Sequence, residues 1–334
     1  MSSGGIIRPN QRYRIQGEFY TLLSRLGYGS FGSVWTSRTE NDFARQMSSG
    51  GIIRPNQRYR IQGEFYTLLS RLGYGSFGSV WTSRTENGDF AAVKVFDLSR
   101  SGNRIRLNER QNSFRNEIKM LDRMRNETEH IVTMYTFEYN PRISMAFIAM
   151  ELADESLIDR VKNLHQRHLR SRMFDRFDFI SANDRQNIWI QLVNIILTLH
   201  RYGIIHCDLK PANLLFFGPL LKVIDFGIAQ DEFTGYNRRQ RIGGTRPYSA
   251  PECFSDRTPV TSKADIWSVG AILYFLTYGK RPIYETAQAP DGVSQTRSRL
   301  VQDILQHCLQ RNASRRPDHQ WLAQHPLTIP SGIF

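Results

Sequence analysis

Four polar residues between His206 and Gly227 have the types and the spacing that catalysis requires. An acid, a lysine and an asparagine follow one another closely, and a second acid comes after a short apolar stretch. These residues are Asp208, Lys210, Asn213 and Asp225. A chance occurrence of the whole run is very unusual, so the run indicates a catalytic site.

The stretch between Asn213 and Asp225 predicts how these side chains meet. Leu214–Phe217 and Leu221–Ile224 are apolar runs around a glycine–proline turn, which indicates a β-hairpin. Because Asn213 precedes the first strand and Asp225 follows the second, an antiparallel hairpin brings them side by side at its open end. Two oxygen donors held there suit Mg²⁺, which usually keeps substrate phosphates among its ligands. With Asp208 placed upstream to orient a substrate hydroxyl, the segment predicts phosphoryl transfer.

A glycine-rich pattern upstream is the candidate for covering the phosphates. It comprises Gly73, Gly75 and Gly78, between two stretches that look like strands, Tyr66–Leu72 and Ser79–Ser83. Alone, G-x-G-x-x-G is a weak signal that dinucleotide-binding folds share, where it opens a helix. Between two strands it favours a hairpin over phosphates instead.

The next strand and helix supply a lysine and an acid. Alternation along Phe90–Phe96 puts Lys94 on one face of the strand, where it suits the nucleotide phosphates better than an edge position in solvent. In Asn112–Arg125, the apolar stripe of the predicted helix also contains Glu117. A carboxylate that faces inward needs a partner, so we expect a Lys94–Glu117 ion pair. The alternative is an exposed glutamate paired within its own helix.

Residues 1–41 recur without a change as residues 47–87. Two copies are too few for a stacked repeat protein, and about forty residues are too few to bury a core alone. Only the second copy continues into the strand with Lys94. The first copy could replace it only with a loop that is 46 residues longer, which loop closure disfavours by roughly 2 kcal/mol. We expect residues 1–46 to be a partial duplicate, from a recent duplication or an error in the gene model, and not an independent domain.

Length and composition fit one large or two ordinary domains, with 334 residues of which 40% are hydrophobic. We recognise no signal peptide and no apolar run long enough to span a bilayer, so we expect an intracellular protein that does not bind membranes. Three widely spaced cysteines fit a reducing compartment. His165 and His168, in an arginine-rich stretch, are expected at the surface.

The formal charge of +13 has two interpretations. It is either a solvated basic surface or an attraction to acidic protein segments or nucleic acid. The chain has no aromatic-interleaved RNA motif and no helix-turn-helix pattern. Direct binding of nucleic acid is therefore not expected.

Taken in order, these motifs resemble those of the eukaryotic protein kinase family, over about residues 59–326. Besides the residues above, the resemblance rests on His206, Phe226-Gly227, Ala250-Pro251-Glu252, Asp265 and Arg316. It implies an α+β, two-lobed protein kinase fold. The N-lobe (about 59–152) is small and β-rich with one main helix, the C-lobe (about 153–326) is larger and mostly α-helical, and residues 327–334 form a tail.

The resemblance also implies roles and cofactors, namely ATP and Mg²⁺. Lys94 holds the α- and β-phosphates, Asp208 is the catalytic base and Lys210 steadies the γ-phosphate. The metal ligands are Asn213 and Asp225. The residues around the nucleotide are Leu72, Gly73, Gly75, Gly78, Val80, Ala92, Met150 as gatekeeper, Glu151 and Ala153 of the hinge, and Leu215. Glu252 and Arg316 are expected to form a buried ion pair that anchors the activation segment.

Within the family, the chain is most similar to the monopolar-spindle (TTK-type) checkpoint kinases. The similarity lies in 61–66, 114–118, 205–213, 221–229, 276–280 and 308–311, and Lys210-Pro211 with Gly244-Thr245 is of the serine/threonine type. It implies dual specificity, protein substrates with acidic flanking residues, and a nuclear or cytoplasmic location with work at the kinetochore. The chain departs from that group at Gly78 and Arg246. Cys207 also removes the arginine that usually binds an activation-loop phosphate.

The sequence therefore predicts an ATP- and magnesium-dependent protein serine/threonine kinase. A catalytically weak pseudokinase that acts as a nucleotide-binding scaffold is the alternative from another class. Its usual signs, loss of the lysine, the base or the metal-binding aspartate, are not found here. A dehydrogenase is disfavoured by the strand lysine after the glycine pattern.

Overall fold

The computed structural model describes residues 12–15, 18–29, 32–39, 53–74, 78–99, 104–170, 177–235, 241–283 and 287–329. The chain divides into two compact units. One comprises Met1–Arg54 and Ser99–Asn103, and the other comprises Pro55–Leu98 and Arg104–Phe334. The residues that the sequence singled out for chemistry all belong to the second unit.

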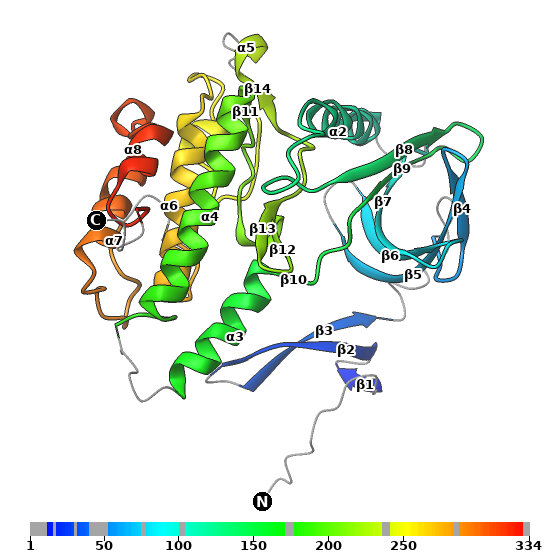
Figure 1. The fold of residues 1–334 in the computed structure, drawn as a ribbon. Helices are drawn as coiled ribbons and strands as arrows, with labels where there is room; N and C mark the ends of the chain where they lie inside the picture. The colour runs from blue at the N-terminus through cyan, green and yellow to red at the C-terminus, as the bar shows by residue number, and fades with distance from the viewer. Residues whose placement is uncertain are drawn as a thin grey trace, which may run out of the picture. The chain divides into compact units, whose positions relative to one another are not determined.

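The second unit begins with a six-stranded antiparallel sheet of order β4-β5-β6-β7-β9-β8 (Figure 1). Its strands are β4 (Arg58–Ile61), β5 (Glu64–Tyr74), β6 (Ser79–Thr85), β7 (Phe90–Asp97), β8 (Met134–Asn140) and β9 (Met145–Met150). All of β9 and most of β7 are buried. Burial on both faces explains why these two strands are apolar almost without interruption.

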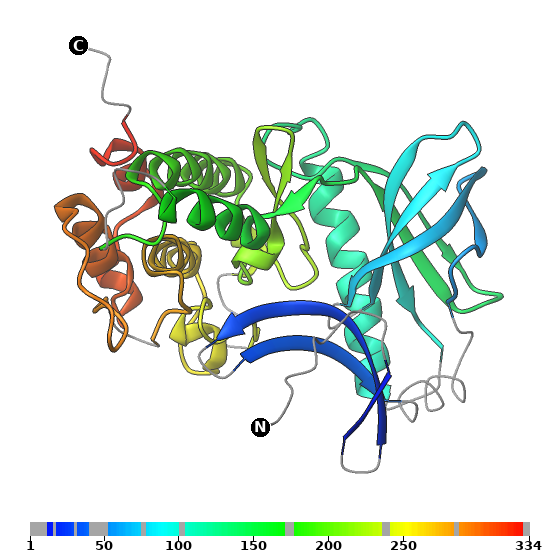
Figure 2. The ribbon, with the colours of Figure 1, turned by 90° about the horizontal axis from the view of Figure 1, so that it is seen from below.

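Helix α2 (Arg104–Arg123) packs against this sheet, as the two views show (Figures 1 and 2). Phe114 of its apolar stripe meets Phe96 of β7, with ring centroids 5.3 Å apart. The helix begins before the expected Asn112. Residues 104–111 carry no regular apolar stripe, but they are rich in arginine, leucine, glutamate and glutamine, which favour helix.

The remainder of the second unit is mostly helical. Its longer helices are α3 (Leu157–Leu169), α4 (Ala182–Arg201), α6 (Lys263–Tyr278) and α7 (Arg299–Cys308). A short helix, α8 (His319–Gln324), follows them. Helix α6 is buried along almost its whole length and packs against α4 and α7. Gly279, at φ 65°, ends it in the left-handed conformation that glycine adopts at low cost. The predicted two-lobed α+β architecture is confirmed.

Short elements lie within and beside the segment from His206 to Gly227. The strands β12 (Leu214–Phe217) and β13 (Leu220–Val223) form the expected hairpin, with the second strand beginning one residue earlier than predicted. A 3-10 turn, η1 (Pro211–Asn213), leads into β12, and β10 (Glu155–Ser156) pairs with its other side. Strand β11 (Ile204–Ile205) pairs with β14 (Gln230–Asp231), which precedes α5 (Glu232–Gly235). The turns η2 (Pro251–Phe254) and η3 (Ala313–Arg315) lie further along the chain.

The expectation for two histidines needs correction. His168 is buried, and His165 is half-buried and stacks on Phe179 with ring centroids 3.7 Å apart. His168 continues the inward stripe of α3 after Val161 and Leu164, at helical spacing. The sequence prediction missed this stripe because the two histidines lie among arginines, which indicated a polar surface.

The described part of the first unit is a separate antiparallel sheet of order β1-β2-β3. Its strands are β1 (Arg12–Ile15), β2 (Glu18–Gly29) and β3 (Gly32–Thr39). They pair in the same register as β4, β5 and β6, 46 residues later. In the described part of the chain, each helix is too short or too polar to cross a bilayer.

Candidate active site

Three charged side chains meet where α2, β7 and the end of the β12–β13 hairpin come together. The Lys94 Nζ lies 2.6 Å from Glu117 Oε2 and 2.9 Å from Asp225 Oδ1. Lys94 and Glu117 are buried. The Lys94–Glu117 pair expected from strand alternation and the helical stripe is therefore present, and the lysine also reaches Asp225.

Burial and charge act in opposite directions on this group. Desolvation raises the pKa of Glu117 to about 7. The positive charge of Lys94, which also pairs with Asp225, offsets only part of this desolvation effect. Burial alone would lower the pKa of Lys94, but the carboxylates of Asp225 and Glu117 outweigh it and raise that pKa. Burial is also the largest single effect on Asp225 and opposes its ionisation. The charge and hydrogen bond of Lys94, with smaller contributions from His206 and the Gly227 N–H, together outweigh burial and lower the pKa of Asp225. Lys94 thus stays charged and Asp225 stays ionised at neutral pH.

A second group surrounds Asp208. The Lys210 Nζ donates to Asp208 Oδ2 at 2.6 Å, and the Thr245 hydroxyl donates to Asp208 Oδ1 at 2.8 Å. Lys210 also donates to the Thr245 hydroxyl oxygen at 2.9 Å. Asn213 Nδ2 donates to the Asp208 carbonyl at 2.9 Å. The structure thus brings together the predicted Asp208, Lys210 and Asn213 and adds Thr245 to them.

The free oxygens of Asn213 and Asp225 fit a divalent metal. Asn213 uses its side-chain Nδ2 on Asp208, and its side-chain Oδ1 accepts no hydrogen bond among the described residues. Asp225 uses Oδ1 for Lys94, and Oδ2 is not hydrogen-bonded within the same residues. Two protein oxygens are what a metal such as Mg²⁺ uses when phosphates and water complete its shell. No group of three or more ionisable metal ligands occurs in the described residues, so a fully protein-made metal cage is not found there.

The predicted hinge offers backbone groups beside the sheet. The Glu151 N–H donates to Thr133 O at 3.0 Å, and its carboxylate pairs with the buried Lys222 at 2.7 Å. The backbone groups of Ala153 and the carbonyl of Glu151 form no hydrogen bond among the described residues. These three groups, and not the Glu151 N–H, are therefore the ones left to pair with a purine.

The apolar residues predicted around the nucleotide differ in exposure. Ala92 and Met150 are buried, Val80 and Leu215 are half-buried, and Leu72 is 55% exposed. Ala92 pairs directly with Met150 across the β7–β9 ladder, and Val80 pairs with Lys94 across β6–β7. Leu72, Val80, Ala92 and Met150 thus lie on four neighbouring strands of the sheet that carries Lys94, whereas Leu215 lies on β12.

The glycine pattern is only partly within the described residues, because Gly75 lies outside them. Gly73 pairs with Val80 one residue before the end of β5, and Gly78 directly precedes β6. A Cβ on Gly78 would come within 2.2 Å of the Val95 carbonyl oxygen, whereas one on Gly73 would meet nothing within 4 Å. Close approach of two strands therefore requires glycine at position 78.

Buried polar contacts hold the backbone that carries Asp208. The Asp265 carboxylate of α6 accepts the N–H groups of His206 and Cys207 at 2.8 and 3.0 Å. Cys207 has a positive φ of 67° and its thiol is buried, which raises its pKa well above the ordinary value. The buried Phe226 ring lies 5.1 Å from the His206 ring. The two segments that carry Asp208 and Asp225 therefore pack on each other.

The segment after Asp225 is anchored at its far end by an ion pair. Arg316 Nη1 and Nη2 lie 2.6 and 2.8 Å from the two oxygens of Glu252. Both residues are buried, as expected from the sequence.

The sequence that forms this site matches a known protein family. The family model "Protein kinase domain" matches residues 66–328. The chain belongs to the protein kinase family. The family uses ATP and a divalent metal, in agreement with the oxygens left free on Asn213 and Asp225.

Similar kinases support the serine/threonine type. Dual specificity protein kinase TTK of Mus musculus is 28% identical over 239 residues, which cover 64% of this chain and 26% of that protein. Its Danio rerio counterpart is 30% identical over 237 residues, with 64% and 22% covered. Serine/threonine-protein kinase mph1 of Schizosaccharomyces pombe is 27% identical over 259 residues, with 65% and 36% covered. The chain thus spans about a quarter to a third of the length of these relatives.

Some contacts of this kinase domain escaped the sequence prediction. The Glu151–Lys222 pair joins the hinge to β13, and the Asn116 side chain of α2 donates to the backbone after Asp225. Glu151 and Asn116 stand in no pattern that periodicity could single out. For Lys222, its place inside the apolar run Leu221–Ile224 was the available signal, since lysines are almost never fully buried unless paired.

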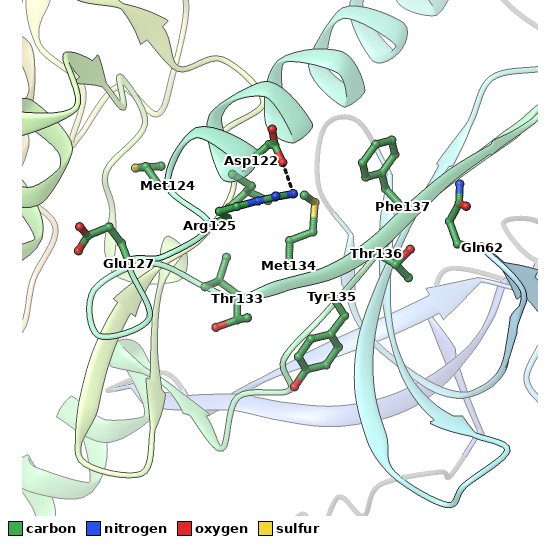
Figure 3. Close-up of a pocket in the computed structure, with 12 residues that line it drawn as sticks. Gln62, Asp122, Met124, Arg125, Glu127, Thr133, Met134, Tyr135, Thr136 and Phe137 are labelled. Atoms are coloured by element: carbon green, nitrogen blue, oxygen red, sulfur yellow. Dashed lines mark hydrogen bonds and ion pairs between the residues drawn. The ribbon is translucent and has the colours of Figure 1, made fainter.

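A pocket of about 270 Å³ lies apart from these residues, between the C-terminal end of α2 and strand β8 (Figure 3). Asp122 and Arg125 form an ion pair at its rim, with Met134 and Phe137 projecting from β8. None of the predicted ATP- or metal-binding residues lines it. It is therefore no part of the candidate active site.

Proposed function

We propose that this kinase domain transfers the γ-phosphate of ATP, with Mg²⁺, to serine or threonine hydroxyls of proteins. The observation that carries the proposal is the arrangement around Asp208, whose carboxylate is held by Lys210 and Thr245 next to Asn213. The completed Lys94–Glu117 pair supports an arrangement competent for catalysis. A pseudokinase is not favoured, because each of these groups is present and connected.

In this proposal the side chains divide the work between base, phosphates and metal. Asp208 orients the substrate hydroxyl and accepts its proton, and Lys210, within reach of Asp208, neutralises charge on the transferred phosphoryl group. Lys94 binds the α- and β-phosphates, and Glu117 holds Lys94 in place. Asn213 and Asp225 would hold Mg²⁺, which would supply positive charge to neutralise the phosphates.

The Asp208 carboxylate can accept a hydrogen bond from a substrate hydroxyl in addition to those it already accepts. Its Oδ1 accepts one from Thr245, and its Oδ2 accepts one each from Lys210 and Asn213. A carboxylate offers about four lone-pair sites, so one remains to accept a further hydroxyl. The Thr245 contact also supports the serine/threonine assignment, since it belongs to the Gly244-Thr245 motif. Activity on tyrosine remains part of the proposal through the dual-specificity relatives.

A preference for acidic residues near the target hydroxyl is proposed from two arginines. Arg246, next to Thr245, stacks on the Phe254 ring at 5.0 Å, and Arg241 Nε donates to the Phe254 carbonyl at 2.9 Å. Neither arginine forms an ion pair with a carboxylate among the described residues. Two guanidinium groups held on one residue attract a carboxylate or phosphate of the substrate.

A spindle-checkpoint role with a kinetochore location is proposed from the relatives alone. The first of them is the mouse kinase TTK, of which the chain spans 26%. The activity within the domain rests on the geometry above, whereas this cellular role rests on similarity.

The test is phosphate transfer from labelled ATP to serine, threonine and tyrosine peptides, with Mg²⁺ or with EDTA. Wild type should label serine and threonine peptides only with metal, and Asp208→Asn should lower the rate at least a hundredfold. Asp256→Asn, at an exposed position just beyond η2 and outside the residues proposed for catalysis, is the control of the same chemistry and should not change the rate. Equal labelling by wild type and Asp208→Asn would refute the assignment.

A further inference from the structure

The side chain of Asn116 contacts the segment that follows Asp225. Its Nδ2 lies 2.9 Å from Phe226 O, 2.8 Å from Ala229 O and 3.4 Å from Gly227 O. All three neighbours are carbonyl oxygens, which only accept hydrogen bonds. The amide must therefore present its NH₂ group to them, and its two hydrogens account for the two short contacts.

Asn116 is the first of several contacts along one face of α2. Lys119 and Arg123 follow it at helical spacing, and their side chains reach Asp231 at 3.6 and 2.9 Å. The backbone from Phe226 to Asp231 thus runs along the helix, joined by Asn116 at its start and by Arg123 at its end.

The same segment is also joined to the catalytic loop. Strand β14 (Gln230–Asp231) pairs with β11 (Ile204–Ile205), which directly precedes His206. Asn116 is next to Glu117 on α2, and its partners directly follow Asp225. The Asn116 side chain therefore links three parts of the site. These are helix α2, whose Glu117 pairs with Lys94, the backbone that carries Asp225 and, through β14 and β11, the loop that carries Asp208.

We propose that Asn116 is a positioning residue for phosphoryl transfer, which rests on the function proposed above. By fixing α2 against the backbone after Asp225, it keeps Glu117, Lys94 and Asp225 within reach of one another. Without it, α2 would contact this backbone only further along, through Lys119 and Arg123 at Asp231. Asp225 itself would then be joined to α2 through Lys94, whose charge the nucleotide phosphates also attract. The expected loss is one of metal binding and rate, with little loss of stability.

The decisive variant is Asn116→Asp, which keeps the size but turns carboxylate oxygens toward three carbonyl oxygens. We expect kcat/KM to fall at least tenfold, and the Mg²⁺ concentration for half-maximal rate to rise several-fold at saturating ATP. Asn116→Ala removes the donors without adding charge and should show a smaller change of the same kind. Asn108→Asp, an exposed position on the same helix, adds the same charge as a control and should leave both quantities unchanged.

Amide hydrogen exchange of residues 226–231 gives a readout that needs no activity. Faster exchange in Asn116→Asp than in wild type and Asn108→Asp, with a melting temperature near that of wild type, supports the proposal. Unchanged exchange together with an unchanged Mg²⁺ dependence overturns it, whether or not kcat falls. If wild type labels no peptide, the proposed function fails, and exchange alone then decides the role of Asn116.

Discussion

The buried Glu252–Arg316 pair allows a quantitative prediction of stability. Replacing Glu252 by Gln leaves Arg316 charged in a site where it is 2% exposed. Breaking a buried pair by neutralising one partner costs about 3–5 kcal/mol. Arg316 also donates to the carbonyls of Gln310 and Lys263 at 2.8 and 2.9 Å, so the lower end of that range is expected for Glu252→Gln. Arg316→Met removes these contacts as well and should reach the upper end.

The assay is thermal unfolding followed by circular dichroism. About 3 kcal/mol corresponds to a decrease of roughly 6 °C in the melting temperature of a domain of this size, and about 5 kcal/mol to roughly 10 °C. The control is Asp122→Asn, which breaks the Asp122–Arg125 pair, whose side chains are 55% and 71% exposed. An exposed pair contributes less than about 1 kcal/mol. If Glu252→Gln lowers the melting temperature no more than Asp122→Asn does, the assignment of a stabilising buried anchor is wrong.

Three further predictions concern Glu117, two glycines of the N-lobe and residues 1–46. Because the pKa of Glu117 is raised to about 7, wild-type activity should fall as the pH drops through 7, and Glu117→Gln should have low activity without that dependence. A raised carboxyl pKa stabilises the fold at a pH below the ordinary glutamate pKa, and this stabilisation is lost as the pH rises through 7. The melting temperature of wild type relative to Glu117→Gln should therefore decrease from pH 5 to 8, and an increase would contradict the assigned pKa shift. Gly78→Ala should lower stability by about 1–3 kcal/mol through its clash with the Val95 carbonyl, and Gly73→Ala should cost clearly less, both measured by denaturant unfolding. Deleting residues 1–46 should change neither kcat/KM nor the melting temperature by much, since the predicted site belongs to the other unit; a large loss in either would show that the first copy is structural.

Local patterns were sufficient where a residue's partner follows from strand or helix periodicity. Alternation along β7 and the stripe of α2 predicted the Lys94–Glu117 contact, and the β12–β13 hairpin was predicted to within one residue. The start of α2 was missed, because its first two turns lack the stripe on which the prediction depended.

Contacts between distant segments lay beyond such patterns. Thr245 reaches Asp208 across 37 positions, and Asn116 reaches Ala229 across 113. Their side chains meet because whole helices and strands pack against one another. The spacing of residues in the sequence does not indicate which loops this packing brings together. The Lys222–Glu151 pair was missed for the same reason.

The two identical copies separate local from tertiary determination within one molecule. In both copies the same residues form three strands in the same register, since alternation and turn residues act over a few positions. Yet among the described residues β3 pairs with β2 alone, whereas β6, its counterpart in the second copy, pairs with both β5 and β7. The sequence of the copy determines the hairpins. Only the chain that follows the second copy, with Lys94 on β7 and Glu117 on α2, makes that copy part of a sheet beside Asp225.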